Sequence, residues 1–231
     1  MVPPRALEPA GLILVDKPAG PSSFAIVART RNRTRARTGH AGTLDPFATG
    51  LLLVLSGRAT RLATRFVGLD KRYLTAVDLS MRSSTGDVEG EPLDHHEPPT
   101  REELVHALQR LRGEIELRIP AASAVKIDGE RAYNLRRRGV VVEMPLRRSM
   151  VAALELVAYD GRVATLDLRV SSGTYVRSIA DALGGHCVTL RRTEVGPFHV
   201  DEADPERIIP VEEALARLPA GTAAGTGNAA S

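Results

Sequence analysis

The sequence predicts an α+β fold in which helices flank a mixed, largely antiparallel sheet. Strand-like runs outnumber the β-α-β units that a parallel sheet requires. Tyr159-Asp160-Gly161 separates two long alternating runs, as the turn of a β-hairpin does. With 231 residues and 43% hydrophobic content, the chain can bury the core of one large domain, or of one domain with an appendage.

Apolar runs and their spacing place the elements of the first half. Residues 11–15 form an apolar run typical of a buried strand, and Ser22 or Ser23 can cap a helix that continues to about Arg31. Further along, we expect a strand at 51–55, a helix at 58–67, a strand at 72–81 and a polar loop at 83–99.

The second half begins with a capping box. Thr100 and Glu103 have the spacing of that motif, and Leu104, Leu108 and Leu111 form the apolar face of the helix that follows. The remaining predictions are a strand at 114–119, a basic excursion at 121–147 with a helix at 131–138, strands at 149–158 and 162–171, a helix at 175–183, a strand at 188–195 and a short helix at 211–218.

Composition narrows the classes of function. No run reaches the ~18–20 apolar residues of a membrane span, and residues 1–10 lack the regions of a secretory signal, so we expect a cytoplasmic protein. Cys187 is the only cysteine, which excludes an intrachain disulfide and a cysteine-based metal cluster. The histidines show no metal-ligand spacing with acidic or cysteine partners, so we expect no metal site.

The basic residues are mostly arginines in clusters, although the net charge is only +3. Arginine suits bidentate phosphate contact and stacking on bases, so we interpret the clusters as an RNA-binding surface, with solvated faces as the alternative. The candidates are Arg29, Arg31, Arg33, Arg35, Arg37, Arg136, Arg137, Arg138, Arg147 and Arg148. The only lysines are Lys17, Lys71 and Lys126, and we expect them to fit a compact ammonium into tight sites.

One acidic residue, Asp45, lies in a polar loop punctuated by Gly39, Gly42 and Gly50. Glycines permit backbone conformations that other residues resist, and Pro46 fixes φ directly after the carboxylate, so the loop can present Asp45 in one defined pose. An ordinary turn, in which the carboxylate bonds local backbone N–H groups, is the alternative. No second carboxylate lies nearby to form the pair that glycosidases use, and the glycine spacing of a phosphate-binding loop is absent. The remaining role for Asp45 is that of a nucleophile, which needs a neighbouring cation to keep the carboxylate ionised.

Six blocks of the sequence carry a family resemblance. They lie at residues 15–20, 39–50, 70–73, 123–126 with 131–133, 172–177, and 190–193 with 196–198. Together they resemble the tRNA pseudouridine synthase B family, whose members make pseudouridine in the T loop of tRNA. The resemblance extends from about residue 11 to about residue 200, and it implies the pseudouridine synthase fold.

The resemblance assigns the catalytic groups. It implies Asp45 as the essential carboxylate, acting either through a covalent adduct with the nucleotide or through proton abstraction that leads to a glycal. It also implies Arg177 as the cation paired with Asp45, and Tyr73 as a ring that stacks on the target base and assists a proton transfer. A surface arginine and a core tyrosine are the corresponding structural alternatives.

Five further residues become substrate-binding candidates. By the resemblance, His40 occupies the T-loop space as nucleotides are flipped out, Leu190 lines the base pocket, and Asp87 is a supporting acidic residue. Tyr175 and Lys17 belong to matched blocks and complete the set.

The chain departs from the family pattern in its C-terminal part. Roughly thirty residues follow Phe198, so we expect the family's C-terminal RNA-binding module, of the PUA type, to be missing. The segment before Leu190 is shorter than usual, and Ala121-Ala122 replaces an aromatic residue. We expect a flexible N-terminus at 1–10, a pseudouridine synthase catalytic domain at 11–205, a short C-terminal extension at 206–219 and a disordered tail at 220–231.

The predicted function is isomerisation of the T-loop uridine of tRNA (position 55) to pseudouridine, with Asp45 and base flipping. No cofactor is expected, since an isomerisation needs no redox partner or group donor. We expect the tRNA T stem-loop as partner, no membrane, no obligate protein partner and a monomer. The alternatives are a noncatalytic tRNA-folding factor and a related synthase with a different RNA target, such as the guide-RNA-directed relatives.

Overall fold

The computed structural model describes residues 10–127, 129–140 and 142–220, so the predictions for the two chain ends lie almost entirely outside it. The chain divides into two compact units: the first unit comprises residues 1–72 and 191–231, and the second unit comprises residues 73–190. Ten strands belong to one hydrogen-bonded sheet, of which β4 (Lys71–Asp78) and β12 (His186–Val195) each have residues in both units. The sheet is mixed and mainly antiparallel, which confirms the predicted fold class.

Strand β3 (Thr49–Ser56) is central in the first unit. It pairs antiparallel with β1 (Gly11–Lys17) along one edge, and β1 pairs in turn with β14 (Asp204–Pro210). On its other edge, β3 pairs antiparallel with β2 (Thr38–His40) and parallel with the end of β12. A two-residue strand, β13 (Phe198–His199), extends this arrangement from β12.

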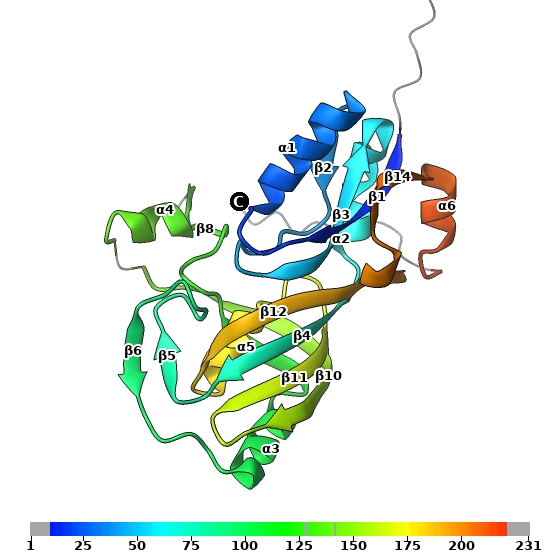
Figure 1. Ribbon diagram of the computed structural model, residues 1–231. Helices are drawn as coiled ribbons and strands as arrows, with labels where there is room; N and C mark the ends of the chain where they lie inside the picture. The colour runs from blue at the N-terminus through cyan, green and yellow to red at the C-terminus, as the bar shows by residue number, and fades with distance from the viewer. Residues whose placement is uncertain (1–9, 128, 141, 221–231) are drawn as a thin grey trace, which may run out of the picture. The chain divides into compact units, whose positions relative to one another are not determined.

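Both faces of β1 and β3 are buried, which explains their continuous apolar runs. One face packs with α1 (Ser23–Thr34), which lies along β2 and β3 in Figure 1. The other face joins a larger apolar cluster that includes Phe66 and Phe198. The short helices of this unit are η1 (Gly57–Leu62), α2 (Ala63–Val67), η2 (Val200–Glu202) and α6 (Val211–Ala216).

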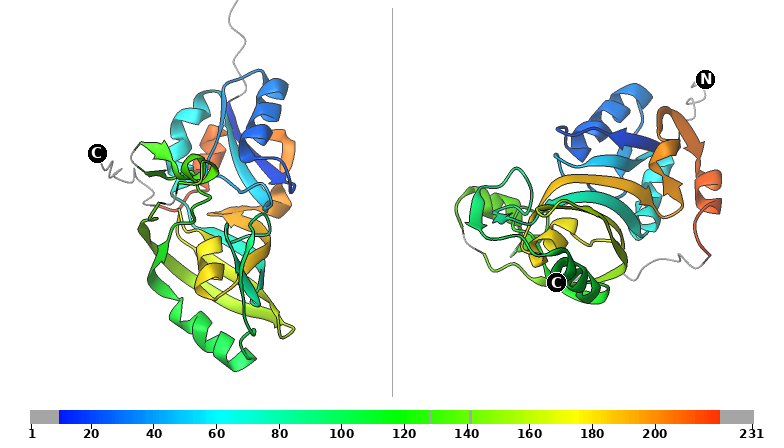
Figure 2. Two further views of the ribbon diagram at one scale, coloured as in Figure 1. Left: turned by 90° about the vertical axis from the view of Figure 1, so that its left-hand side faces the viewer. Right: turned by 60° about the horizontal axis from the view of Figure 1, so that its bottom comes forward.

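The strands of the second unit follow the order β12, β4, β11 (Val163–Val170), β10 (Leu146–Tyr159) and β7 (Gly113–Arg118). The Asp160 carboxylate accepts from the backbone N–H groups of Arg162 and Val163 at 2.8 and 2.7 Å, which confirms the predicted hairpin turn between β10 and β11. The capping box of Thr100 and Glu103 is confirmed at the start of α3 (Arg101–Arg110), and Figure 2 shows this helix beside β10.

Smaller elements complete the second unit. They are the hairpin of β5 (Met81–Ser83) and β6 (Pro92–His95), the hairpin of β8 (Lys126–Ile127) and β9 (Glu130–Arg131), and the helices α4 (Ala132–Arg137) and α5 (Val176–Ala182).

The structure corrects several predictions. The segment 83–99 is not only a polar loop, because β6 lies inside it and pairs with β5. The predicted helix at 58–67 is a 3₁₀ turn followed by the short α2. The strands β2, β13 and β14 were not predicted, since each is short or polar and is defined by its partner. The predicted boundary between residues 205 and 206 falls inside β14, which pairs with β1.

The alternation of the arginines at 29–37 predicts that several of them share a face if the segment is extended. Residues 29–33 instead lie in α1, where positions two apart point about 200° apart. Arg35 ends the helix in a left-handed conformation (φ 53°). The segment is therefore not extended, and the arginines of the series do not share one face. Separately, none of the helices within the described ranges is long and apolar enough to span a membrane.

Candidate active site

The loop between β2 and β3 carries Asp45, and it is held by side chains from elsewhere in the first unit. Asp45 is half-buried. Gly42 and Gly50 adopt φ values of +100° and +101°, which residues with a Cβ rarely adopt. The predicted use of glycines at these two positions is confirmed.

Ser23 anchors the residue before Asp45. Its hydroxyl donates to the carbonyl oxygen of Leu44 at 2.9 Å and accepts from the N–H of Leu44 at 2.8 Å. Both partners are buried, so each of these backbone groups would lose its hydrogen-bond partner without the hydroxyl. The first residue of α1 therefore fixes the chain directly ahead of the carboxylate.

Lys17 anchors the residue after Asp45. The side chain is 0% exposed, and its ammonium donates to the carbonyl oxygens of Pro18 and Pro46 at 2.8 and 3.1 Å. The N–H of Gly20 donates to the same Pro46 oxygen at 2.8 Å. The expectation that Lys17 fits a compact ammonium into a tight site is confirmed, and the contacts that it makes here are with the loop itself.

Arg192 holds the loop from β12. Its guanidinium is 1% exposed and donates to the carbonyl oxygens of Leu51, Gly42 and Thr43 at 2.7, 3.1 and 3.3 Å. No carboxylate of the described chain forms an ion pair with it. Because a buried cation without a counterion is costly, three well-placed carbonyl dipoles are what keep this guanidinium in the interior.

These anchors account for four of the five carbonyls from Gly42 to Pro46. Arg192 bonds the first two, Ser23 the third, and Lys17 the last, while the carbonyl of Asp45 itself accepts from the N–H of Ala48 at 3.2 Å. A loop whose backbone acceptors are all bonded, most of them by residues distant in the sequence, has little freedom to rearrange. The structure thus gives the Asp45 carboxylate a rigid support.

Two titratable groups lie beside Arg192. Burial, and secondarily the guanidinium, lower the pKa of His40 below its ordinary 6.5, so the imidazole is neutral at pH 7. Burial and Arg192 also lower the pKa of Lys71 from 10.5 to about 8, against the opposing charge of Asp70. The Lys71 ammonium, 5% exposed, donates to the carbonyl oxygen of Val67 at 2.6 Å. Lys71 therefore occupies a second tight site, as expected.

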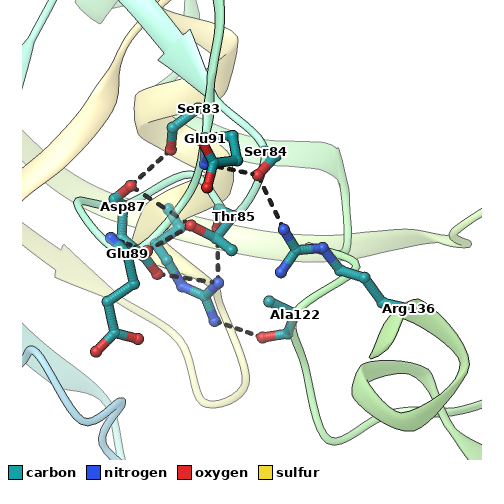
Figure 3. A network of polar contacts seen from close by, with 9 residues as sticks. Ser83, Ser84, Thr85, Asp87, Glu89, Glu91, Ala122 and Arg136 are labelled. Carbon is teal, nitrogen blue, oxygen red and sulfur yellow. Dashed lines mark hydrogen bonds and ion pairs between the residues drawn. The ribbon is translucent and has the colours of Figure 1, made fainter. Parts of the chain in front are cut away.

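Arg177 and Asp87 meet in the second unit. Arg177 is 3% exposed, donates to the carbonyl oxygens of Thr85 and Ala122 at 2.7 and 3.0 Å, and lies 3.4 Å from a carboxylate oxygen of Asp87. The other carboxylate oxygen of Asp87 accepts from the Thr85 hydroxyl and from the N–H of Glu89 (Figure 3). Arg177 is thus a buried arginine, and the surface alternative is wrong.

The candidates for contact with the base, Tyr73, Tyr175 and Leu190, also belong to the second unit. Tyr73 on β4 is 7% exposed, and Leu190 on β12 is 6% exposed. Tyr175 precedes α5 and packs against the apolar cluster of Ile119, Ala132 and Met144. Pairing of Arg177 with Asp45, and base contact by Tyr73, Tyr175 and Leu190, stay predictions.

Several candidate RNA-binding arginines make intramolecular contacts. Arg136 donates to the Ser84 hydroxyl at 2.9 Å (Figure 3), Arg138 pairs with Glu130 at 2.7 Å, and Arg148 pairs with Glu116 at 3.2 Å. Arg33 pairs with Glu206 at 3.0 Å and also donates to the carbonyl of Pro205. By contrast, the exposed side chains of Arg29, Arg31, Arg35 and Arg37 make no hydrogen bond or ion pair with any described residue. The side chain of Arg137 lies outside the described part, and Arg147 packs over Gly173.

From the sequence, Arg192 is only a member of a basic cluster and of a matched family block, and Ser23 is only a possible helix cap. One signal was available for Arg192. Leu190, Arg192 and Glu194 alternate along β12, and all three are buried. The inward face of this strand therefore carries two ionisable residues. Among the described residues, no group of three or more His, Cys, Asp or Glu side chains could hold a metal ion.

Comparison with solved structures gives the class of protein. The fold resembles a pseudouridylate synthase at a TM-score of 0.50 and 17% identity, which shows a pseudouridine synthase fold and no more. The fold also resembles a chain in a crystal structure of a Cbf5-Nop10-Gar1 complex, with a TM-score of 0.64 and 30% identity over 85% of this chain and 52% of that chain.

Sequence comparison gives the family. The model of the TruB family pseudouridylate synthase N-terminal domain matches residues 29–176. A tRNA pseudouridine synthase B of Leifsonia xyli subsp. xyli is 41% identical over 94% of this chain and 76% of its own length, and one of Corynebacterium aurimucosum is 42% identical over 91% and 78%. The chain belongs to the TruB family of pseudouridine synthases, which confirms the resemblance.

Proposed function

We propose that this chain converts the T-loop uridine of tRNA to pseudouridine, with Asp45 as the essential carboxylate. The single observation that carries the proposal is the rigid loop around Asp45, whose carbonyls are bonded by Arg192, Ser23 and Lys17. Relatives at 41–42% identity are tRNA pseudouridine synthases B, which supports tRNA as the substrate.

The reaction breaks the C1′–N1 bond of uridine, turns the freed uracil and forms the C1′–C5 bond. C5 loses its proton and N1 gains one. The atoms of the reaction balance without an oxidant, a reductant or a group donor. Asp45 acts on the nucleotide either as a nucleophile at the sugar or as a base that leads to a glycal, and both roles need an ionised, fixed carboxylate. The target uridine is flipped out of the T loop, because the enzyme must reach C1′ and C5 from outside the base stack.

The second unit supplies the other proposed groups. The Arg177 guanidinium is held by two carbonyls and by Asp87, so its position is defined before substrate binds. We assign it to pair with Asp45, and we assign the Tyr73 ring to stack on the flipped uracil. The neutral His40 suits insertion among the bases of the T loop, since it carries no charge to desolvate.

The decisive experiment compares Asp45→Asn with the parent on a T stem-loop labelled with tritium at C5 of the target uridine. The variant should release no tritium while its affinity for the RNA stays within about threefold, because the change removes the reactive oxygen but little surface. Asp201→Asn, at an exposed position, is the matched control and should behave as the parent. Turnover of Asp45→Asn within tenfold of the parent would contradict the assignment.

The same assay separates the alternatives. A parent protein that binds the stem-loop but releases no tritium from any uridine RNA would indicate a tRNA-folding factor. Tritium release from other RNAs, but not from the T stem-loop, would indicate a synthase with another target. Activity on the minimal stem-loop should also survive exhaustive chelation, and a loss that one specific metal restored would contradict a cofactor-independent reaction.

A further inference from the structure

Phe24 is an aromatic side chain left in solvent beside the Asp45 loop. Phe24 is 70% exposed, whereas Phe66 and Phe198 are 1% and 0% exposed. Its chain neighbour Ser23 is bonded in both directions to Leu44, the residue before Asp45. The backbone at Phe24 is therefore held in place at the start of α1, next to the residue that anchors the Asp45 loop.

The exposed ring shares a helix face with a free cation. Ala28 and Arg31 follow Phe24 at spacings of four and seven residues, which places the three on one stripe of α1. Arg31 is exposed, and its side chain has no hydrogen-bond or ion-pair partner among the described residues. Seven residues of helix place the backbone positions of Phe24 and Arg31 about 10 Å apart along the axis.

The stripe is distinct from the faces of α1 that have a structural use. Ser23, Ile26, Val27 and Thr30 form the buried face. Arg33 is nine residues from Phe24 and hence on the opposite flank, where it pairs with Glu206. Among the described residues of the first unit, none forms a hydrogen bond or ion pair with the side chains of this stripe.

We propose that this stripe binds an unpaired nucleotide of the RNA substrate, with a nucleobase stacked on the Phe24 ring and a backbone phosphate on Arg31. The inference rests on the proposed function, because the RNA is the substrate whose target base enters at Asp45. Any base can stack on an aromatic ring, since every base has a π face, and arginine suits a phosphate oxygen. One ring beside one guanidinium is too small an apolar area to dock a folded protein.

Fluorescence tests the contact directly. The chain contains no tryptophan, so Phe24→Trp introduces a unique reporter on the stripe. Titration with the T stem-loop should quench its emission strongly, because a stacked base quenches an indole ring. Val157→Trp, at a 59% exposed site on β10 in the second unit, is the matched control and should be quenched far less. No quenching in F24W, or equal quenching in both variants, would overturn the proposal.

Affinity gives an independent readout. Phe24→Ala should weaken stem-loop binding by about tenfold, the size expected for one lost stacking contact, while Phe24→Tyr should keep the parent affinity. The tritium release rate at saturating RNA should stay at the parent level in both variants. Unchanged affinity of Phe24→Ala would overturn the proposal that the stripe binds a nucleotide, while the proposed function would stand. A parent protein that binds the stem-loop but never releases tritium would overturn the function, and the quenching would still report the contact.

Discussion

Arg192 lies opposite Gly50 where β12 and β3 run parallel. A Cβ at Gly50 would come within 2.2 Å of the Arg192 carbonyl oxygen, so the two backbones approach more closely than any other residue would allow. This approach brings the Arg192 guanidinium to the carbonyls of Gly42, Thr43 and Leu51. The close approach at Gly50 in the Asp45 loop and the position of Arg192 on β12 therefore depend on each other.

Arg192→Gln should reduce the rate at saturating RNA by about 10- to 100-fold and leave the RNA affinity within about threefold. The shorter amide cannot bond three carbonyls, so the loop gains freedom and the Asp45 carboxylate loses its fixed position. Arg192→Lys should recover only part of the rate, because a single ammonium cannot reproduce the planar fork. Single-turnover tritium release measures the rate, and filter binding measures the affinity.

Arg191→Gln is the control for this experiment. Arg191 is the preceding residue of β12, but its side chain points the other way and pairs with Asp16 at 2.7 Å in a half-exposed position. Its replacement should leave the saturating rate unchanged. Equal rates for the parent and for Arg192→Gln would show that the carbonyl contacts do not position the loop.

Gly50→Ala should destabilise the protein far more than Gly20→Ala. Both glycines have nearly the same φ, +101° and +100°, so both substitutions bring the same backbone strain of about 1–2 kcal/mol. A Cβ at Gly20 meets nothing within 4 Å, whereas one at Gly50 collides with the Arg192 backbone and adds an overpacking cost of about 1–3 kcal/mol or more. Urea unfolding of the two variants measures the difference, and similar midpoints would contradict the close approach.

Lys71 should make the stability depend on pH in the alkaline range. Its pKa is lowered from 10.5 to about 8, so between these values the unfolded chain holds a proton that the folded chain has lost. The free energy of unfolding therefore rises with pH in this window, by roughly 2 kcal/mol between about pH 7 and pH 9.5. Below pH 8 the buried ammonium is charged, and its full destabilising effect is present.

Urea unfolding at a series of pH values measures this effect as a difference between the parent and Lys71→Met. The methionine variant should lack the alkaline rise, while Lys126→Met, at an exposed position, should follow the parent curve. Parallel curves for the parent and Lys71→Met would mean that the proton is not lost on folding.

The arginines of α1 should divide into structural and RNA-binding residues. Arg33→Gln should lower the melting temperature slightly, since it removes the bonds to Glu206 and Pro205, and leave the salt dependence of RNA binding unchanged. Arg31→Gln should leave the melting temperature unchanged and flatten the slope of log K against log salt by about 0.7 to 0.9, the loss of one phosphate contact. The reverse pattern would place the RNA on the flank of Arg33.

Short-range chemistry made much of the fold predictable from the sequence alone. The capping box at Thr100, the hairpin turn at Asp160, and the buried strand at 11–15 all follow from residues within a few positions of one another. Glycine spacing likewise located the Asp45 loop, because positive φ is a local property. The family blocks then indicated the class of chemistry, which the comparisons confirmed at the level of the TruB family.

The tertiary structure alone decided what holds the loop and which arginines are free. Ser23, Lys17 and Arg192 reach the loop from 21, 29 and 149–150 residues away, and the short β14 is a strand only because β1 offers it a partner. Likewise, the pattern of alternating arginines did not reveal that Arg33 pairs with Glu206 while Arg31 pairs with none of the described residues. Such contacts depend on strand register and helix rotation, which bring distant residues together through packing of the whole core rather than through any local signal.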